Sequence, residues 1–316
     1  MITVFSVTVG SRSLSLDTIL QSICAFDPQN DEHLVVWSLR LPRLLIALLA
    51  GAALGVSGAI MQAITRNPLA EPGLLGVNAG AAAAVILAIS LGGLTSMHQY
   101  VWWGFVGAGL AGAAVFLVGR GRAGSASPLR LVLVGAALSI ALGSLTGIVV
   151  INAPTSALDD FRNWSAGALD GRDMDVVAVL GCCVAVGLLM CTTIASSLNA
   201  IALGDELSRA LGADLRQVLV LACIAIMLLA GSATAAAGPI GFIGLMAPHL
   251  ARHLTGPDQR WILLFSGLVA ALLLLVADII GRLISAPSEV AAGIVTTLVG
   301  GPVFLFIIRR FRAGSP

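Results

Sequence analysis

Lysine is absent from this chain, and all 17 basic residues among its 316 are arginine. A nucleotide-binding P-loop needs a lysine on the phosphates, so this chain cannot carry one, and any ATP hydrolysis that drives it must come from a partner. Charge as a whole is scarce, at 10% of residues, where a soluble domain has about a quarter. The net charge of +1 gives no reason to expect binding to nucleic acid.

The sequence also has few residues in patterns that would indicate metal or cofactor binding. The five cysteines have no metal-site spacing, and four of them lie inside apolar runs, where a free thiol acts as a small hydrophobe. His249 and His253 are four residues apart and could share one helix face as ligands. No third ligand accompanies them, which favours a structural or interfacial role. We therefore expect no disulfide framework, no metal and no cofactor.

Hydrophobic residues dominate what remains. They make up 58% of the chain and its mean hydropathy is +1.00, so the natural solvent is a lipid bilayer. The sequence predicts an all-α polytopic membrane protein with a single transmembrane domain over residues 1–316. The apolar run at 243–254, the seventh of nine, is short and contains Pro248, which predicts a half-span or broken helix. The nine candidate spans are 44–62, 74–92, 101–118, 129–151, 174–195, 217–237, 243–254, 261–284 and 290–308.

The distribution of arginine predicts the orientation. One set of loops, together with the C-terminal tail, holds eleven arginines and five acids, and the opposite set holds six arginines and eleven acids. By the positive-inside rule the first set is cytoplasmic. The C-terminus is then inside and residues 10–40 lie outside.

The start of the chain fits this orientation poorly. Nine spans with an inside C-terminus place the N-terminus outside, and residues 1–9 have no basic segment typical of a signal peptide. A tenth span ahead of residue 10 would resolve the conflict, and residues 2–9 resemble its last two turns. We therefore expect either a truncated first span or a misassigned start site.

Residues 197–216 lie between two spans on the predicted inner side. Leucines and an isoleucine alternate there with charged residues, and Gly204 and Gly212 divide the segment. The pattern predicts two short amphipathic helices that fit a groove on a soluble partner. The alternative is a helix that lies on lipid, which the acids in the segment disfavour.

Polar residues inside the spans are few, and each has a competing interpretation. Asp278 lies deep in an apolar run with Arg282 one helical turn away, which favours a structural ion pair over the lone coupling acid of an ion-driven carrier. The string Gly55–Gly58 matches the GxSG of intramembrane proteases, with Ser57 as the nucleophile, but the histidines lie toward the wrong end of a broken span. Glycines four apart, as at Gly143 and Gly147, predict close helix packing within the subunit, with a contact between subunits as the alternative.

Five long strings of this sequence have the order and composition of a family signature. They are RLPRLLIALLAGAALGVSGAIMQAITRNPLAEPGLLGVNAGA (40–81), LGDELSRALGADLR (203–216), GPIGFIGLMAPHLARHLTG (238–256), ADIIGRL (277–283) and IVTTLVGGPVFLFIIRR (294–310). Together they resemble the FecCD-type permeases. The resemblance covers about residues 35–312, and its segments 159–173 and 66–81 look most like ferric-enterobactin permeases.

This resemblance implies a ten-helix permease subunit of a type II ATP-driven importer in the bacterial inner membrane. Its cargo would be an iron–siderophore complex, with haem or cobalamin as alternatives, and an ion-coupled secondary transporter is the rival class. Implied partners are a second permease subunit of the same or a paralogous kind, two cytoplasmic ATPases, a periplasmic binding protein and membrane lipid. The subunit itself would not be an enzyme.

The resemblance also implies roles for single residues. Arg40, Arg43 and Arg282 match arginines that dock acidic residues of the binding protein. Asn67 and Leu69 match a cytoplasmic gate, and residues 129–151 match the pore-lining helix. Residues 152–173 match a periplasmic segment with a short helix, which places Trp164 near the outer mouth. The segment that receives the motion of the ATPases would include Gly204, Asp205, Glu206, Ala210, Leu211 and Gly212.

Overall fold

The computed structural model describes residues 2–8, 14–119, 128–210, 214–285 and 288–313. These residues form helices, turns and loops, and no strand occurs among them. The helices are α1 (Ile2–Thr8), α2 (Leu16–Cys24), α3 (Asp31–Val35), the π-helical η1 (Val36–Arg40), α4 (Leu41–Thr65), the 3-10 turn η2 (Pro72–Leu75), α5 (Val77–Ser90), α6 (Met97–Gly119), α7 (Pro128–Asn152), α8 (Thr155–Ser165), α9 (Met174–Ala202), α10 (Asp205–Ala210), α11 (Leu215–Ala237), α12 (Ile243–Thr255), α13 (Gln259–Ile284) and α14 (Ala292–Ala313).

Each of the nine predicted apolar runs forms a helix. Six helices in the described part of the chain are long and apolar enough to cross a membrane, namely α3–α4 as one continuous unit, α6, α7, α9, α11 and α13. The helix α5 has 14 residues and α12 has 13, which is short of the roughly 20 residues that a bilayer requires. An all-helical membrane protein is thus confirmed.

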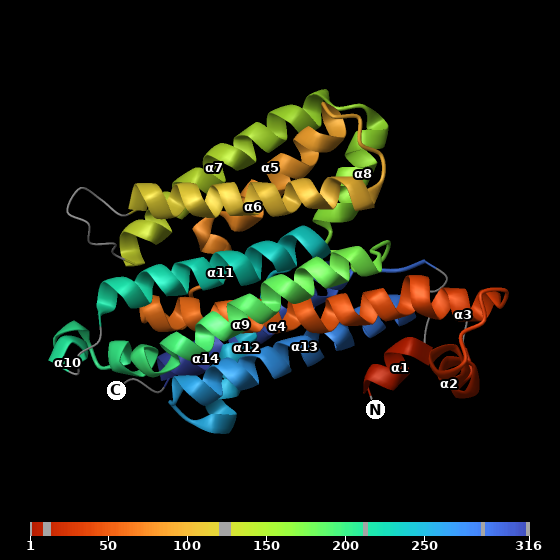
Figure 1. Ribbon diagram of the computed structural model, residues 1–316. Coiled ribbons are helices and arrows are strands. Elements are labelled where there is room, and N and C mark those ends of the chain that lie inside the picture. The colour runs from red at the N-terminus through yellow and green to blue at the C-terminus, as the bar shows by residue number, and fades with distance from the viewer. Residues whose placement is uncertain (1, 9–13, 120–127, 211–213, 286–287, 314–316) are drawn as a thin grey trace.

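The long helices lie in two layers that run in roughly the same direction (Figure 1). Helices α5, α6 and α7 form one layer, and α4, α9, α12, α13 and α14 form the other, with α11 between them. The N-terminal helices α1–α3 gather at one end of the bundle, and α10 lies at the opposite end together with the last residues of α14. We call these the outer end and the inner end, after the orientation that the arginines predict.

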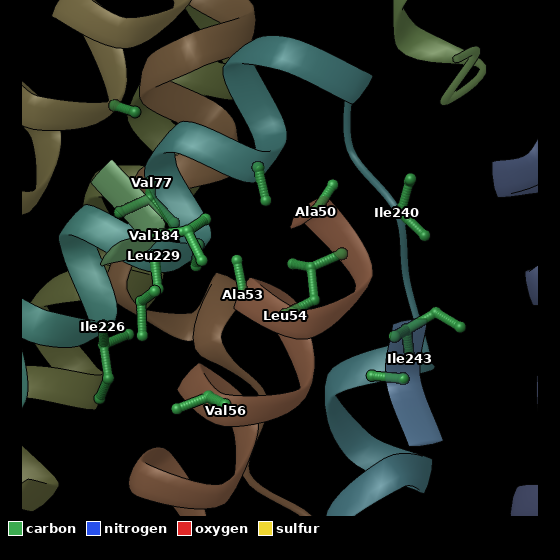
Figure 2. Packing of buried hydrophobic residues seen from close by; sticks show 14 of the residues in the cluster. Ala50, Ala53, Leu54, Val56, Val77, Val184, Ile226, Leu229, Ile240 and Ile243 are labelled. Atoms are coloured by element: carbon green, nitrogen blue, oxygen red, sulfur yellow. The ribbon is translucent and has the colours of Figure 1, made fainter. Parts of the chain in front are cut away.

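Helix α4 runs through the core because its small residues let other backbones come close. A Cβ atom added at Gly55 would lie 2.2 Å from the carbonyl oxygen of Ser266, and one at Gly58 would lie 1.8 Å from that of Gly244. Only glycine fits where helices approach this closely. Figure 2 shows apolar side chains of this core, with Ala53 on the side of α4 that faces Leu229 of α11 and Leu54 on the side toward Ile240 and Ile243.

One helix departs from the sequence-based expectation, and another agrees with it. The predicted pair of short helices over residues 197–216 is wrong in its first half, because α9 continues without a break to Ala202. Among the residues of this segment that the structure describes, α10 is the one separate short helix. The broken span is α12, which contains Pro248 and begins in the interior after Phe242, whose backbone is left-handed at φ +66°.

Candidate functional site

The outer end holds a network of charged side chains. Asp278 is 1% exposed and its carboxylate accepts from two arginines, with Arg43 Nη2 at 2.7 Å and Arg282 Nη2 at 3.0 Å. The predicted ion pair between Asp278 and Arg282 is confirmed. Arg43 also contacts Glu289 Oε2 at 2.6 Å. Two cations and two anions therefore balance one another in a partly buried position, as charges removed from water must.

Arg282 and a third arginine, Arg40, also hold the N-terminal helix α1. Arg282 donates to the carbonyl oxygen and the hydroxyl of Ser6, each at 2.8 Å. Arg40 donates to the carbonyl oxygens of Val7 and Thr8, the second at 3.0 Å. These carbonyls lie at the C-terminal end of α1, where a helix offers unsatisfied acceptors that favour a cation.

The structure thus brings the three predicted docking arginines together at one end of the molecule. Their guanidinium groups contact residues of the same chain: Arg282 is buried, while Arg40 and Arg43 are half-buried. Because burial limits contact with a partner, Arg40 and Arg43 are the better placed of the three for docking, and the docking role stays a prediction.

An outer cavity of about 860 Å³ opens beside this network. Four of its lining residues are acids, against two arginines, so its wall is predominantly anionic. Sequence reasoning concentrated on the arginines and missed this cavity, although the excess of acids in the outer loops was the available signal. The charged lining residues are Asp159, Asp160, Asp170, Glu289, Arg43 and Arg162.

Helix α8 forms one wall of the outer cavity. It lies inside the segment 152–173 that was expected to contain a short helix. Trp164 was expected near the mouth, but its side chain is fully buried and its Nε1 atom lies 3.4 Å from the carbonyl oxygen of Ala235. Trp164 therefore belongs to the packing behind the mouth, because α8 is amphipathic and turns its aromatic face inward.

At the inner end, the predicted gate residues form a tight turn. The backbone of Arg66 is left-handed at φ +49° and ends α4. Asn67 Oδ1 accepts from the amide of Leu69 at 3.0 Å, which is an Asx-turn. The turn directs Leu69 outward, and 44% of this residue is exposed. A gating role requires a second subunit opposite this side chain and stays a prediction.

The predicted coupling segment begins beside this turn. Arg66 Nε donates to the carbonyl oxygen of Ile201 at 2.8 Å, which ties the end of α4 to the end of α9. Gly204 has a left-handed backbone at φ +106°, and Ser208 Oγ closes the turn onto the carbonyl of Gly204 at 2.6 Å. Leu207 is 56% exposed.

Of the other predicted coupling residues, Asp205 opens α10, and Glu206 and Ala210 are exposed on it. Leu211 and Gly212 lie outside the described residues.

Glu71 is a residue that sequence reasoning missed. Burial raises the pKa of its carboxyl group, and a hydrogen bond with the backbone of Phe242 partly offsets that rise. Phe242 is the residue from which α12 starts, so the carboxylate satisfies and neutralises the N-terminus of a helix that begins inside the protein. The two residues are distant in sequence, and nothing in the chain order reveals their contact.

The histidine pair lies in a second cavity, of about 590 Å³, at the inner end. The Nε2 atoms of His249 and His253 are 3.3 Å apart. Arg66 and Arg252 line the same cavity, and two guanidinium groups disfavour a bound cation. Among the described residues no group of three metal-ligating side chains occurs, and the structural or interfacial role of the histidine pair stays a prediction.

Comparisons with known proteins agree with this architecture. The chain is 42% identical over 314 residues to the ferric enterobactin transport system permease protein FepD of Escherichia coli (strain K12), covering 99% of this chain and 93% of that protein. It is 39% identical to the iron(3+)-hydroxamate import system permease protein FhuB of Bacillus subtilis (strain 168), covering 98% of this chain and 80% of that protein. It is 36% identical to the hemin transport system permease protein HmuU of Yersinia pestis, with coverage of 97% and 91%.

A solved structure shares the fold. It is described as an inward-facing conformation of a putative metal-chelate type ABC transporter, and it superposes with a TM-score of 0.83 at 28% identity over 98% of this chain and 94% of the other. The model of the FecCD transport family matches residues 1–310. Because that match spans nearly the whole sequence, the chain belongs to the FecCD transport family.

Proposed function

We propose that this chain is the membrane-spanning permease subunit of an ATP-driven importer that carries iron–siderophore complexes from the periplasm to the cytoplasm. The observation that carries this proposal is the family match over residues 1–310, joined to identities of 42% and 39% with permeases named for ferric enterobactin and iron(3+)-hydroxamate. The chain performs no bond chemistry. It supplies a path whose open and closed states are biased by ATP bound elsewhere.

The proposed assembly contains this chain and a second permease subunit in the bacterial inner membrane, two ATPases on the cytoplasmic side and a binding protein in the periplasm. A separate ATPase is required because a chain without lysine has no P-loop. The nine apolar helices from α4 to α14 serve as the spans of a ten-span permease, with α5 and α12 crossing only part of the bilayer. The C-terminus lies on the cytoplasmic side, where the arginines concentrate.

Each end of the bundle has a proposed partner. At the outer end, Arg40 and Arg43 meet acids of the binding protein, while Arg282 holds Asp278 and α1 behind them. At the inner end, the segment from Gly204 to Gly212 receives the motion of the ATPase. Asn67 and Leu69 narrow the cytoplasmic exit against the equivalent turn of the second permease.

Haem import is a weaker second candidate. The observation that favours it is the 36% identity with a hemin permease, below the identities with the two siderophore permeases. The acidic outer cavity does not separate the two cargoes, because selection by the binding protein precedes entry.

Uptake of radioiron-labelled ferric siderophores by cells that lack this subunit tests the proposal. Adding back the chain should restore uptake only when the partner ATPase keeps its P-loop lysine. Uptake that persists with an inactive ATPase would instead establish an ion-coupled carrier. If the chain restored uptake of haem but not of ferric siderophores, the cargo would be haem, the second candidate.

The coupling assignment has its own test. Replacing residues 204–212 by an unrelated loop of equal length should leave the protein inserted in the membrane but abolish uptake. An equal replacement in the loop over residues 91–96, which joins α5 to α6 at the outer end, is the control. Undiminished uptake after the first replacement would refute the coupling role.

A further inference from the structure

Helix α11 joins the inner end of the molecule to the outer end. It starts directly after the proposed coupling segment, where Asp214 Oδ1 accepts from the amides of Arg216 at 2.9 Å and Gln217 at 3.1 Å. Its 23 residues span about 35 Å at the rise of an α-helix. Figure 1 shows it running from the side of α10 toward the foot of α8.

The helix is held on all sides over its second half. Residues 233 and 235–237 are alanines with no exposed surface, and Ile226 and Leu229 are equally buried. It contacts α4, α5, α6 and α9. Interiors packed in this way resist compression, so we expect α11 to transmit a displacement of its inner end along its length without bending.

Two side chains, one from the segment after α8 and one from α8 itself, donate hydrogen bonds to the outer end of α11. Arg172 is 3% exposed and its Nε donates to the carbonyl oxygen of Ala236 at 2.5 Å. Its Nη1 donates to the carbonyl of Asp170 at 3.0 Å, and its Nη2 to that of Ala168 at 3.3 Å. One guanidinium group thus joins the last turn of α11 to the loop that follows α8, and cations are favoured at this end of a helix.

Trp164 makes the second joint, from α8 itself to the carbonyl of Ala235. The backbones at this junction leave no free space. A Cβ atom added at Gly238, whose φ is +77°, would lie 2.2 Å from the carbonyl oxygen of Trp164. The amide of Gly293, at the start of α14, donates to the carbonyl of Gly167 at 3.0 Å. The ends of α8, α11 and α14 therefore meet as one rigid junction.

The exposed face of α8 lines the outer cavity with Asp159, Asp160 and Asn163. At its outer end, α11 is therefore connected to the wall of the outer cavity through single side chains. At its inner end, it adjoins the proposed coupling segment, which faces the ATPase.

We propose that Arg172 and Trp164 are positioning residues for transport, which fasten α8 to the outer end of α11 so that displacement of the coupling segment moves the wall of the outer cavity. This inference rests on the proposed function. It assigns to two buried side chains the step between the ATPase stroke and the opening or closing of the outer mouth.

The test uses the whole transporter, with both permease positions, the ATPase and the binding protein, reconstituted in liposomes. A reporter cysteine replaces Asn163 in a chain whose own five cysteines are removed. A membrane-impermeant maleimide then measures how ATP changes the labelling rate at the outer cavity. Chelate imported per ATP hydrolysed is measured on the same preparations without the reporter.

We expect Arg172→Gln to lower the import per ATP by about tenfold, as expected for loss of hydrogen bonds from a charged donor, and to remove the effect of ATP on labelling. Trp164→Phe, which keeps an aromatic side chain but loses the indole N–H donor, should do the same to a smaller extent. It also serves as the second variant if Arg172→Gln fails to fold. Arg260→Gln and Trp103→Phe, both on exposed side chains, are the matched controls and should match the parent chain.

A purely structural role would lower the yield of folded protein but leave the import per ATP and the labelling response of the folded fraction unchanged, and that result would overturn the inference. If the unmodified transporter imports chelate but its labelling rate is indifferent to ATP, the inference fails while the proposed function stands. If the unmodified transporter imports nothing under ATP, both fail.

Discussion

Helices α4 and α7 are almost equally hydrophobic, yet the fold uses them in opposite ways. The most apolar stretch of the unit that contains α4 has a mean hydropathy of 2.3 and that of α7 has 2.2. Of the residues in those stretches, 72% are buried in the first and 6% in the second. Lipid tails and side chains are equally apolar, so hydropathy alone does not separate a central helix from a peripheral one.

The space around the glycines does distinguish α4 from α7. Both helices carry glycines at close spacing, but a Cβ atom at Gly55 or Gly58 would collide with a neighbouring backbone, whereas Gly143 and Gly147 have nothing within 4 Å. The same sequence pattern therefore serves packing inside the subunit on α4. On α7 it remains available for a contact outside the subunit, such as the proposed second permease.

The largest expected effect comes from enlarging a glycine on each helix. Gly58→Leu should abolish folded protein, because a Cβ atom there would lie 1.8 Å from the carbonyl oxygen of Gly244 and helix backbones cannot yield as side chains do. The cost should exceed the about 1–3 kcal/mol of ordinary overpacking. Gly143→Leu should fold normally and, on our proposal, weaken assembly with the second permease. Size-exclusion chromatography in detergent measures both, and a folded Gly58→Leu protein would remove the contrast between the helices.

The ion network that joins α4 to α13 gives the next effect. Asp278→Asn removes the carboxylate that Arg43 and Arg282 share, which should lower the free energy of unfolding by about 3–5 kcal/mol, as when one member of a buried pair is lost. Glu289→Gln, at a site where the side chain is 34% exposed, should cost about 0–1 kcal/mol. Thermal unfolding in detergent compares the two variants. Equal losses would show that burial does not set the strength of this network.

A smaller effect is expected where glycine is needed for its backbone alone. Gly204→Ala places a side chain at φ +106° with open space around it, so strain of about 1–2 kcal/mol is the whole cost. Gly109→Ala, also in open space but in a helix without positive φ, is the control and should not destabilise. If the two variants unfold at the same midpoint, backbone strain at position 204 is excluded.

The smallest effect should follow Gly147→Ala on the exposed face of α7. We expect a change in the stability of the isolated subunit within about 0.5 kcal/mol, as for surface positions. Unfolding of the monomer in detergent is the measurement. A loss comparable to that at Gly58 would mean that α7 packs within the subunit and is not free to meet a partner.

Much of the architecture could be predicted, because apolar runs define helices strongly. All nine runs are helices, and the pair Asp278 and Arg282 follows from their spacing of four. The contacts of the candidate site were harder to predict from the sequence. Arg43 reaches Asp278 across 235 positions, and the amphipathic segment at 197–202 turned out to extend α9, since hydrophobic pattern does not reveal where a helix ends.

The sequence by itself determined that this chain is embedded in a membrane, that it is helical and that it carries no P-loop for ATP hydrolysis. Those conclusions follow from composition, from runs of apolar residues and from the absence of lysine, each of which is a local property. Only the tertiary structure decided that the outer arginines hold α1 and Asp278, that Glu71 caps α12 and that Arg172 and Trp164 clasp α11. The reason is that every one of these contacts joins residues from separate segments, and a bilayer removes the polarity signal that would otherwise distinguish inside from outside.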